Sequence, residues 1–501
     1  MIKNKHIVNP HQISEFLQKP PSLFTKRDII KFIERHNTRM VNFRYVGGDG
    51  KLKLLNFVIT GKKHLEQILS AGERIDGSSI FDYIDASSSD LYVIPQYKTA
   101  YVNPFSAIPA IDILCSYFTS EGKPLPSAPE YIVKKAHNSL KEATGLTLEA
   151  MGELEYYIIY EKQPLYPTTA QKGYHGTQPF CKGENMRHEV VQTLAQVGIK
   201  VKYSHSEVGN TFEGNQEMEQ HEIECTPSPI EEAANQIIIA KWILRMIAYK
   251  YGVTLTFAPK VLVGYAGSGL HIHTKLTKNG KNMMIDSNKL SDAAKKAIAG
   301  YLTLAGSLTA FGNTVPISYL RLVPHQEAPT NICWGDRNRS VLVRVPLGWI
   351  NVNNMAKEAN PLEKGFSPDF SNNQTVEFRA PDGSADIHLL LAGLAVAARY
   401  GLEKNNSLEI ARKHYVDVNI FSEKNKTIQK RLQKLPASCW ESSERLSSDR
   451  KIYEEYNVFS PMVIDGVIKK LKSYNDKKLS EKLYGKKDAI KKLVDQYLHY
   501  A

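Results

Sequence analysis

The feature that most constrains this chain is a set of acidic and imidazole side chains placed in segments that otherwise predict buried β-strands. Glu153 and Glu155 adjoin the apolar run 154–160, and a spacing of two puts both carboxylates on one face of a strand. Two neighbouring carboxylates in an apolar strand repel each other unless a cation lies between them. The sequence therefore first indicates a cation site built on a β-sheet.

Further residues of the same kind lie far along the chain, again in segments that predict strands. They are Glu207, Glu222, His271 and Glu377, with His273 and Arg379 each two residues beyond one of them. Taken singly, a Glu-x-Glu or His-x-His pair occurs often by chance. Five carboxylates and one histidine in such segments make a metal site the stronger interpretation. Oxygen-rich coordination favours Mg²⁺ or Mn²⁺, and the imidazole favours tolerance of Mn²⁺.

Arginines concentrate in the window 321–344, which also holds Glu327 and Asp336. They are Arg321, Arg337, Arg339 and Arg344. The planar guanidinium group binds phosphate or carboxylate bidentately, so this density suits a polyanion. A surface ion-pair network is the plainer interpretation of the window alone. With two metals, however, an arginine clamp describes a phosphoryl-transfer site. The sequence contains no Walker loop and no kinase motif, so a nucleotide would be held by another fold.

In order along the chain, these motifs resemble those of the glutamine synthetases, specifically the bacterial and archaeal, type I-like class that assembles as two stacked hexameric rings. The resemblance runs from about residue 27 to the C-terminus. It rests on Asp76-Gly-Ser-Ser79, Glu153-Leu-Glu155, Glu207, Glu222, Gly267-Ser-Gly-Leu-His271-Ile-His273, the segment 321–329, Asn338-Arg339-Ser340 and Glu377-Phe-Arg379. It implies an α+β fold, with a small N-terminal β-grasp-like domain and a large C-terminal catalytic α/β domain of the glutamine synthetase/guanido kinase type, an antiparallel sheet with helices.

The resemblance also implies roles for individual residues. One metal ion, Mg²⁺ or Mn²⁺, would be bound by Glu155, Glu207 and Glu222, and a second by Glu153, His271 and Glu377. The residues expected to bind substrates are Ser79, Gly267, Arg321 and Arg379. Those expected to contact ATP are His273, Lys275, Arg339 and Arg344, and the two arginines would also offset charge on the transferred phosphoryl group. The remaining catalytic groups would be Glu327, on a flap over glutamate, and Asp76, which would deprotonate ammonium in a neighbouring subunit.

The implied activity is ATP-dependent ligation of ammonia to L-glutamate through γ-glutamyl phosphate. Several positions depart from the family pattern, namely Ala266 for Asn, Thr375 for Arg, Lys275 for Ser, and His325-Gln326 for Gly-Tyr. They leave open a sister enzyme that joins glutamate to a polyamine or ethanolamine. Retention of Asp76 and Ser79 favours ammonia, because a bulkier amine would not need a small anionic pocket. A catalytically silent relative would have lost metal ligands, and all six are present.

Local patterns predict how the chain is divided. We expect an extended arm over residues 1–25, the β-grasp domain over 26–117 and the catalytic domain over 118–501, with a helical tail from about 404. Strands are expected at 40–45, 53–59 and 91–94. Helices are expected at 228–252, opened by a capping box at Ser228, and at 387–402.

Composition and charge set the expected surroundings of the protein. A chain of 501 residues with 42% hydrophobic and 23% charged residues predicts a soluble globular protein, and it has no apolar run of the roughly 18 residues that span a bilayer. The net charge of +12 comes largely from lysines on amphipathic helices of the tail, so we expect no nucleic-acid partner. The five scattered cysteines predict reduced thiols in the cytoplasm. Because Asp76 would serve a neighbour, we expect a ring-shaped homo-oligomer, a dodecamer.

Overall fold

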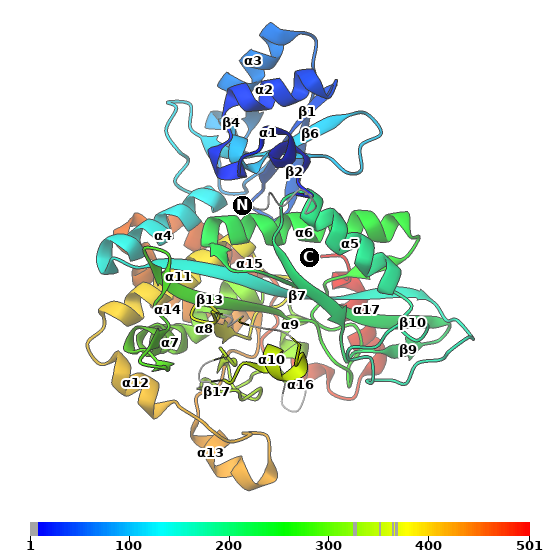
Figure 1. Ribbon diagram of the computed structural model, residues 1–501. Helices are drawn as coiled ribbons and strands as arrows, with labels where there is room; N and C mark the ends of the chain where they lie inside the picture. Colours follow the sequence, from blue (N-terminus) through cyan, green and yellow to red (C-terminus); the bar gives the residue numbers. More distant parts are fainter. Residues whose placement is uncertain (1–8, 324–327, 350–351, 363–364, 366–368, 501) are drawn as a thin grey trace.

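The computed structural model describes residues 9–323, 328–349, 352–362, 365 and 369–500. A small N-terminal domain lies on one side of a larger domain (Figure 1). Its sheet has the order β2–β1–β6–β4–β3, and β5 pairs with β6. The strands are β1 Met40–Val46, β2 Leu52–Val58, β3 Glu73–Asp76, β4 Asp90–Pro95, β5 Tyr101–Val102 and β6 Ala110–Phe118. Because β1 runs parallel to β6 and antiparallel to β2, the expected β-grasp domain is confirmed.

The segment before this sheet is not an extended arm where the structure describes it. Its helices are α1 Gln12–Leu17 and α2 Lys26–Arg35, and α3 Lys62–Ala71 follows β2. Ile13 of α1 is fully buried, so this segment packs into the core of the small domain. α2 begins at a capping box in which Thr25 accepts from the backbone of Asp28 and Asp28 accepts from the backbone of Thr25. The sequence did not predict α1, because a helix of six residues among polar residues gives too short an apolar pattern.

A buried ion pair fixes the central strands of the small domain. Arg44 of β1 donates from Nε to Oδ2 of Asp112 on β6 at 2.7 Å, and Asn42 donates to Oδ1 at 2.7 Å. The guanidinium group of Arg44 also lies 4.2 Å from the ring centroid of Trp242, a residue of helix α6 (Ile230–Lys250) in the large domain. The pair therefore joins the small sheet to the large domain.

We expect Asp112→Ala to loosen this junction, because the change leaves the Arg44 cation buried without its partner. Breaking a buried pair costs about 3–5 kcal/mol. Amide hydrogen exchange in β1 and β6 measures the local free energy of opening, which should fall by that amount. Asp49→Ala is the matched control, because it removes the exposed pair of Asp49 with Lys53, worth about 1 kcal/mol or less. Equal effects of the two changes would contradict this role.

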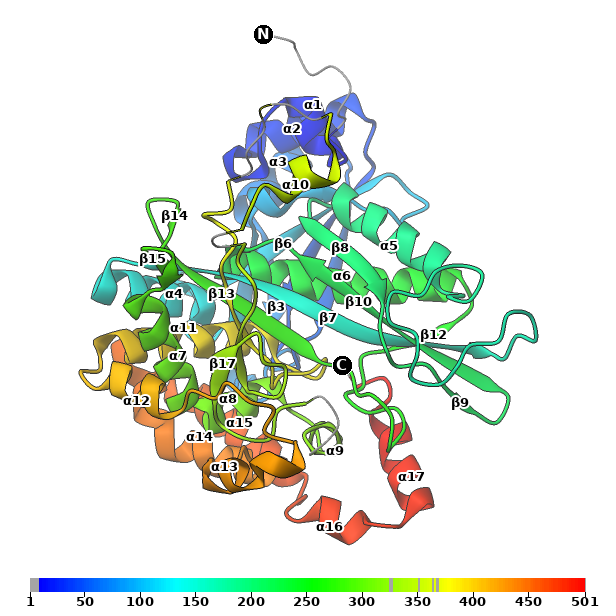
Figure 2. The ribbon, with the colours of Figure 1, turned by 60° about the horizontal axis from the view of Figure 1, so that its bottom comes forward.

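The large domain is built on a second sheet of order β17–β18–β19–β13–β7–β10–β8. In Figure 2, β13, β7, β10 and β8 cross the middle of the molecule. The main strands are β7 Thr147–Glu161, β8 Val201–Ser206, β10 Gln216–Cys225, β13 Leu270–Lys278, β17 Trp334–Asp336, β18 Val343–Val345 and β19 Val376–Phe378. Short strands along it are β9 Thr211–Glu213, β11 Ser228–Pro229, β12 Thr254–Thr256 and β14 Lys281–Asn282, and β15 Ile285–Asp286 pairs with β16 Lys289–Leu290. The pairings are antiparallel except for β17 with β18, which confirms the expected antiparallel sheet.

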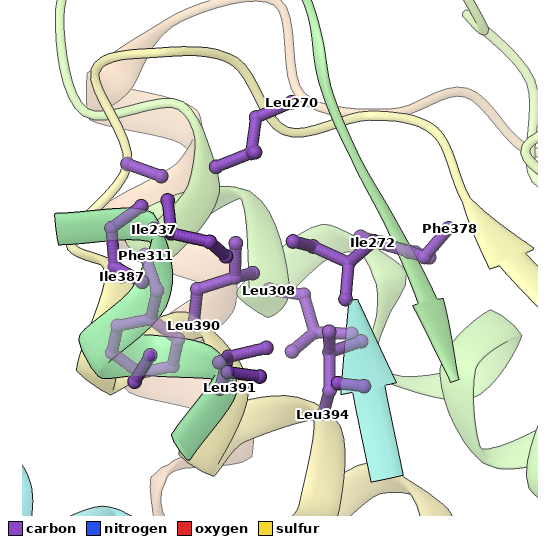
Figure 3. Packing of buried hydrophobic residues seen from close by; sticks show 14 of the residues in the cluster. Ile237, Leu270, Ile272, Leu308, Phe311, Phe378, Ile387, Leu390, Leu391 and Leu394 are labelled. Atoms are coloured by element: carbon purple, nitrogen blue, oxygen red, sulfur yellow. The ribbon is translucent and has the colours of Figure 1, made fainter. Parts of the chain in front are cut away.

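Helices pack against one face of this sheet and form the main core. They include α4 Pro129–Thr144, α5 Glu184–Gln196, α6, α7 Asp292–Thr303, α8 Ala305–Gly312, α11 Ile387–Glu403 and α14 Cys439–Glu454. The short helix α9 Ser318–Arg321 follows α8 along the chain. Figure 3 shows Leu270 and Ile272 of β13 in one apolar cluster with Leu390 and Leu394 of α11, and Leu308 lies between the two elements. The apolar strand residues thus point to the helices, and their alternate neighbours point to the opposite face.

Two predicted helices can be compared with the structure. The helix expected at 387–402 is confirmed as α11, whose first turn is capped by Asp386 accepting from the backbone of Leu389. The capping box expected at Ser228 is wrong. Ser228 and Pro229 form strand β11 against β7, and α6 begins at Ile230 with no side-chain cap. Pairing to the long strand satisfies the backbone of Ser228, so its side chain is not used as a cap.

The C-terminal part is helical, as the sequence predicts. Its elements are α12 Ser407–Lys413, α13 Lys426–Arg431, α15 Pro461–Ser473, α16 Leu479–Leu483 and α17 Lys487–Tyr497, and α10 Met355–Ala359 lies before β19. Val494 and Tyr497 of α17 pack with Ile317 and Leu320, just before Arg321. Among the described helices, none combines the length and apolarity that crossing a membrane requires.

Candidate functional site

Strand register gathers the predicted metal ligands on the sheet face opposite the helices. His271 lies opposite Glu153 in the pairing of β13 with β7, and Glu222 lies opposite Glu155 in the pairing of β10 with β7. Partners across a ladder share a face, so these pairs project together. Glu377 of β19 lies opposite His273 on the other side of β13, and its side chain reaches the same group. The spacing of two seen in the sequence is therefore the spacing of one sheet face.

The side chains of this face are close enough to share cations. His271 Nδ1 lies 3.1 Å from Glu153 Oε2 and 3.6 Å from Glu377 Oε1, and its Nε2 lies 3.9 Å from Glu155 Oε1. Three groups place their ligand atoms within 4.8 Å of one another: Glu153 with His273 and Glu377, Glu153 with Glu222 and His271, and Glu207 with Glu222 and His205. Five of the six predicted ligands belong to these groups. The sixth, Glu155, accepts from the backbone of Gly269 at 2.7 Å and from Gln220 at 3.1 Å.

His205 belongs to the group of Glu207 and Glu222, and the sequence did not predict it. Its Nε2 lies 3.2 Å from Glu222 Oε1, and its Nδ1 lies 3.7 Å from Glu207 Oε1. The available signal was its place two residues before Glu207, the same spacing that identified the other pairs. Gln220, which holds Glu155, was also missed, because an amide carries no charge pattern to single it out.

The electrostatics of the group fit bound cations. Burial first, and then the like charge of the neighbouring carboxylates, raises the pKa of Glu222 well above its usual value. Burial alone would also raise the pKa of Glu153, but the imidazoles of His273 and His271 outweigh it and hold that pKa well below its usual value. A divalent ion among these oxygens would remove the repulsion at Glu222, so the residues present suit Mg²⁺ or Mn²⁺.

Arginines border the carboxylates on one side. Arg344 of β18 donates to Glu377 Oε2 at 2.8 Å, and Arg379 donates from Nε to Glu377 Oε1 at 2.8 Å. Arg379 also donates to the backbone carbonyl of Arg339. Arg321 is buried, donates to the carbonyl of Ala380 at 2.8 Å, and its pKa is lowered by that burial. Glu377 thus connects the imidazole and carboxylate group to two guanidinium groups.

A cavity of about 30 Å³ lies where the acidic and basic sides meet. Its lining includes Glu155, Glu207, Gln220, Gly267, Arg321 and Arg379. A Cβ at Gly267 would lie 2.5 Å from the carbonyl oxygen of Pro259 and 2.9 Å from Cγ of Arg321. The close approach of the Pro259 carbonyl and of Arg321 therefore requires glycine there. Five other residues predicted to bind metal or substrate line the same cavity: Glu155, Glu207, His271, Arg321 and Arg379.

Two residues expected near ATP have partners in the structure. Lys275 forms an ion pair with Glu149 at 3.1 Å, which already engages its ammonium group. His273 lies with Nδ1 2.9 Å from Thr375 Oγ1 and with Nε2 2.8 Å from Glu153 Oε1. His273 therefore faces the carboxylates with Nε2 and Thr375 with Nδ1.

The predicted ammonium residues lie in the small domain. Asp76 is exposed at the end of β3, where it accepts from Ser79 Oγ at 2.6 Å and from Ser78. These hydrogen bonds hold the pKa of Asp76 below its usual range, so it is an anion at neutral pH. The metal ligands all lie in the large domain. Glu327 lies outside the described residues.

One further cluster of metal-ligand types, Cys181, Glu219 and His221, is explained by hydrogen bonding instead. Arg187 lies with Nη1 2.8 Å from His221 Nδ1, and arginine has only donors. Nδ1 must accept, so Nε2 carries the ring proton and faces Glu219 Oε1 at 2.8 Å. A protonated nitrogen offers no lone pair to a metal.

Comparison with known proteins gives matches over almost the whole chain. The family model for the catalytic domain of glutamine synthetase matches residues 126–483, and the model for its β-grasp domain matches residues 37–120. The chain is 30% identical over 441 residues to the glutamine synthetase of Thermotoga maritima, covering 86% of this chain and 92% of that protein. It is 28% identical over 443 residues to the enzyme of Thermus thermophilus, covering 86% and 91%.

Solved structures share the fold at lower identity. The glutamine synthetase of Plasmodium falciparum superposes with a TM-score of 0.74 at 21% identity, covering 91% of this chain and 97% of that one. A GmaS/ADP complex superposes with a TM-score of 0.69 at 16% identity, covering 89% and 96%. Both likenesses extend over the small and the large domain.

Proposed function

This chain belongs to the glutamine synthetase family, and we propose that it is an ATP-dependent glutamate–ammonia ligase. The reaction would proceed through γ-glutamyl phosphate and give L-glutamine, ADP and phosphate. The observation that carries the proposal is the junction at Glu377, where carboxylates and imidazoles that suit cations meet Arg344 and Arg379. A site that transfers a phosphoryl group onto a carboxylate needs this combination, because two anions must be brought together.

The residues would divide the work by their charge. Two or more Mg²⁺ or Mn²⁺ ions would supply the positive charge that lets the γ-phosphate of ATP approach the γ-carboxylate of glutamate. They would be held by Glu153, Glu155, Glu207, Glu222, His271 and Glu377, with His205 supporting Glu222. Arg344 and Arg339 would offset negative charge on the phosphoryl group during its transfer. Arg321 and Arg379 would bind the carboxylates of glutamate. Gly267 would let the backbone approach the substrate.

The second half of the reaction needs a base and exclusion of water. Ammonium becomes a nucleophile only after losing a proton, and Asp76, with Ser79 beside it, would accept that proton. Glu327 would close over the intermediate and take a proton from the attacking amine. Since Asp76 is exposed in the small domain, it would serve the site of a neighbouring subunit in a closed ring, a dodecamer of two hexamers. We place the enzyme in the cytoplasm, with no nucleic-acid or membrane partner.

A γ-glutamyl-amine ligase is the second candidate. It is favoured by the likeness to the GmaS/ADP complex and by Ala266, whose small side chain borders the cavity. Asp76 favours ammonium, because its small hydrogen-bonded carboxylate suits a small cation.

Release of ADP with glutamate and different amines distinguishes the two candidates. We expect kcat/KM for ammonium to exceed that for ethanolamine, methylamine and putrescine by about a hundredfold or more, since a site built to bind one polar group strongly rejects a misfit. The γ-amide product should be identified by mass spectrometry in each reaction. A higher kcat/KM for any of the larger amines would replace the first candidate by the second.

A further inference from the structure

We infer that His273 is an additional ligand of the metal ions and makes this site prefer Mn²⁺ to Mg²⁺. The inference rests on the proposed function, because it concerns the ions of the same site. His273 lies on β13 two residues beyond His271, and only 4% of its surface is exposed. It belongs to the group of Glu153 and Glu377. The metal centre would then hold two imidazoles instead of one.

The distances around His273 suit one ion. Its Nε2 lies 2.8 Å from Glu153 Oε1 and 4.0 Å from Glu377 Oε2. Ligand atoms at about 2.1 Å from an octahedral ion lie about 3 Å apart when adjacent and about 4.2 Å apart when opposite. Small shifts would therefore bring the three side chains onto a common centre. The buried Nε2 makes no aligned hydrogen bond within the described residues, although Glu153 Oε1 is near, so an ion between Nε2 and the two carboxylates would give it a partner.

The partner of the other ring nitrogen also suits coordination. Nδ1 lies 2.9 Å from Oγ1 of Thr375, and a hydroxyl oxygen can accept a hydrogen bond. When Nδ1–H donates to Thr375, Nε2 can release its proton to a competing metal ion and bind that ion with its lone pair. Histidines that bind metals nearly always donate their other ring N–H to an oxygen in this way.

His221 provides the contrast within the same chain. It too is buried, with Nε2 2.8 Å from a glutamate, but its Nδ1 faces Arg187 and must accept. The proton is then on Nε2, and the ring cannot bind a metal there. The partner of Nδ1 thus separates the two histidines, and Thr375 becomes the positioning residue that can accept from Nδ1–H when Nε2 of His273 binds an ion.

A second imidazole changes which ion the site prefers. Mg²⁺ takes oxygen ligands and gives up water reluctantly, whereas nitrogen ligands raise the affinity for transition metals such as Mn²⁺. We therefore expect tighter binding of Mn²⁺ than of Mg²⁺ in the protein without nucleotide. Removing the hydroxyl that accepts from Nδ1 should lower the affinity for Mn²⁺ by about 10–100-fold, the usual effect of losing a partner of a metal-binding histidine. The affinity for Mg²⁺ should stay nearly unchanged.

Titration of the metal-stripped full-length protein tests this inference. Free Mn²⁺ is measured by its electron paramagnetic resonance signal, and Mg²⁺ by its competition with Mn²⁺. Thr375→Val removes the hydroxyl at nearly constant shape, Thr375→Ser retains it, and His273→Asn removes the ligand. We expect Thr375→Val and His273→Asn to weaken the same class of Mn²⁺ sites, and Thr375→Ser to match the unchanged protein. Circular dichroism and oligomer size confirm that each variant is folded.

The outcomes separate this inference from the proposed function. Equal Mn²⁺ affinity in the unchanged protein, Thr375→Val and His273→Asn would overturn the role of His273 and leave the ligase proposal standing. Loss in His273→Asn alone would overturn the positioning role of Thr375. Failure of the unchanged protein to bind either ion would contradict the proposed function itself. If His273→Asn does not fold, Thr375→Val against Thr375→Ser decides the inference alone.

Discussion

Glu222→Gln is expected to stabilise the metal-free protein while removing most of its ligase activity. Burial first, and then the like charge of its neighbours, raises the pKa of Glu222, so a neutral amide of the same shape removes the cost of burying a charge and relieves repulsion. The melting temperature without metal should rise by several degrees. Turnover should fall by about 10²–10³-fold, the usual effect of losing one preorganised electrostatic partner. A rise in stability together with a loss of turnover would show that the charge of this carboxylate serves catalysis and not folding.

The control for Glu222→Gln lies on the same strand. Glu217 of β10 is also buried and accepts from Thr168 at 2.8 Å, but it is outside the metal groups. Glu217→Gln should keep turnover within about twofold, because the amide oxygen can still accept that hydrogen bond. The addition of Mn²⁺ should raise the melting temperature of the control and of the unchanged protein more than that of Glu222→Gln. Loss of stability in metal-free Glu222→Gln would show that this carboxylate is structural.

Subunits carrying Asp76→Asn are expected to restore activity to subunits carrying Glu222→Gln when the two are assembled together. Each variant alone should be about 10²-fold or more below the unchanged enzyme, the first through loss of a base and the second through loss of a ligand. If each site takes Asp76 from one subunit and Glu222 from its neighbour, random assembly in equal amounts leaves about a quarter of the sites intact. The regained activity should approach that fraction.

Differently tagged subunits make this experiment decisive. Unfolding and refolding, or co-expression, gives mixed oligomers that carry both tags and can be purified through each in turn. Mixed oligomers that remain inactive would show that Asp76 does not act across a subunit interface. A mixture of Asp76→Asn with Ser79→Ala subunits is the control, because both changes lie in the same small domain and no site should regain both residues.

The spacing of the acidic and histidine residues predicted much of the site, because every second residue of a β-strand lies on the same face. Glu153 and Glu155, and likewise His271 and His273, share a face as their spacing requires. What spacing could not give is the register that sets Glu222 opposite Glu155, since pairing depends on contacts far apart in the sequence. The contact of His273 with Thr375 was equally hidden, because the two residues lie 102 positions apart in the sequence.

The fold departed from expectation where tertiary contacts outweighed local signals. The capping box at Ser228 was locally plausible, yet the long strand β7 offered its backbone a partner. The helix α1 is short and gains its stability from burying Ile13, a contact that no local pattern reveals. Arg187 was likewise unmarked in the sequence, although it sets the protonation of His221.

The fate of a labelled oxygen tests the central claim most directly. Glutamate carrying ¹⁸O in its γ-carboxylate is incubated with the enzyme, ATP, ammonium and Mg²⁺ or Mn²⁺, and the phosphate is analysed by mass spectrometry. If the γ-carboxylate is activated as an acyl phosphate, one labelled oxygen appears in phosphate for each molecule of glutamine formed. Release of ADP with unlabelled phosphate, or with no γ-amide product, would contradict the account.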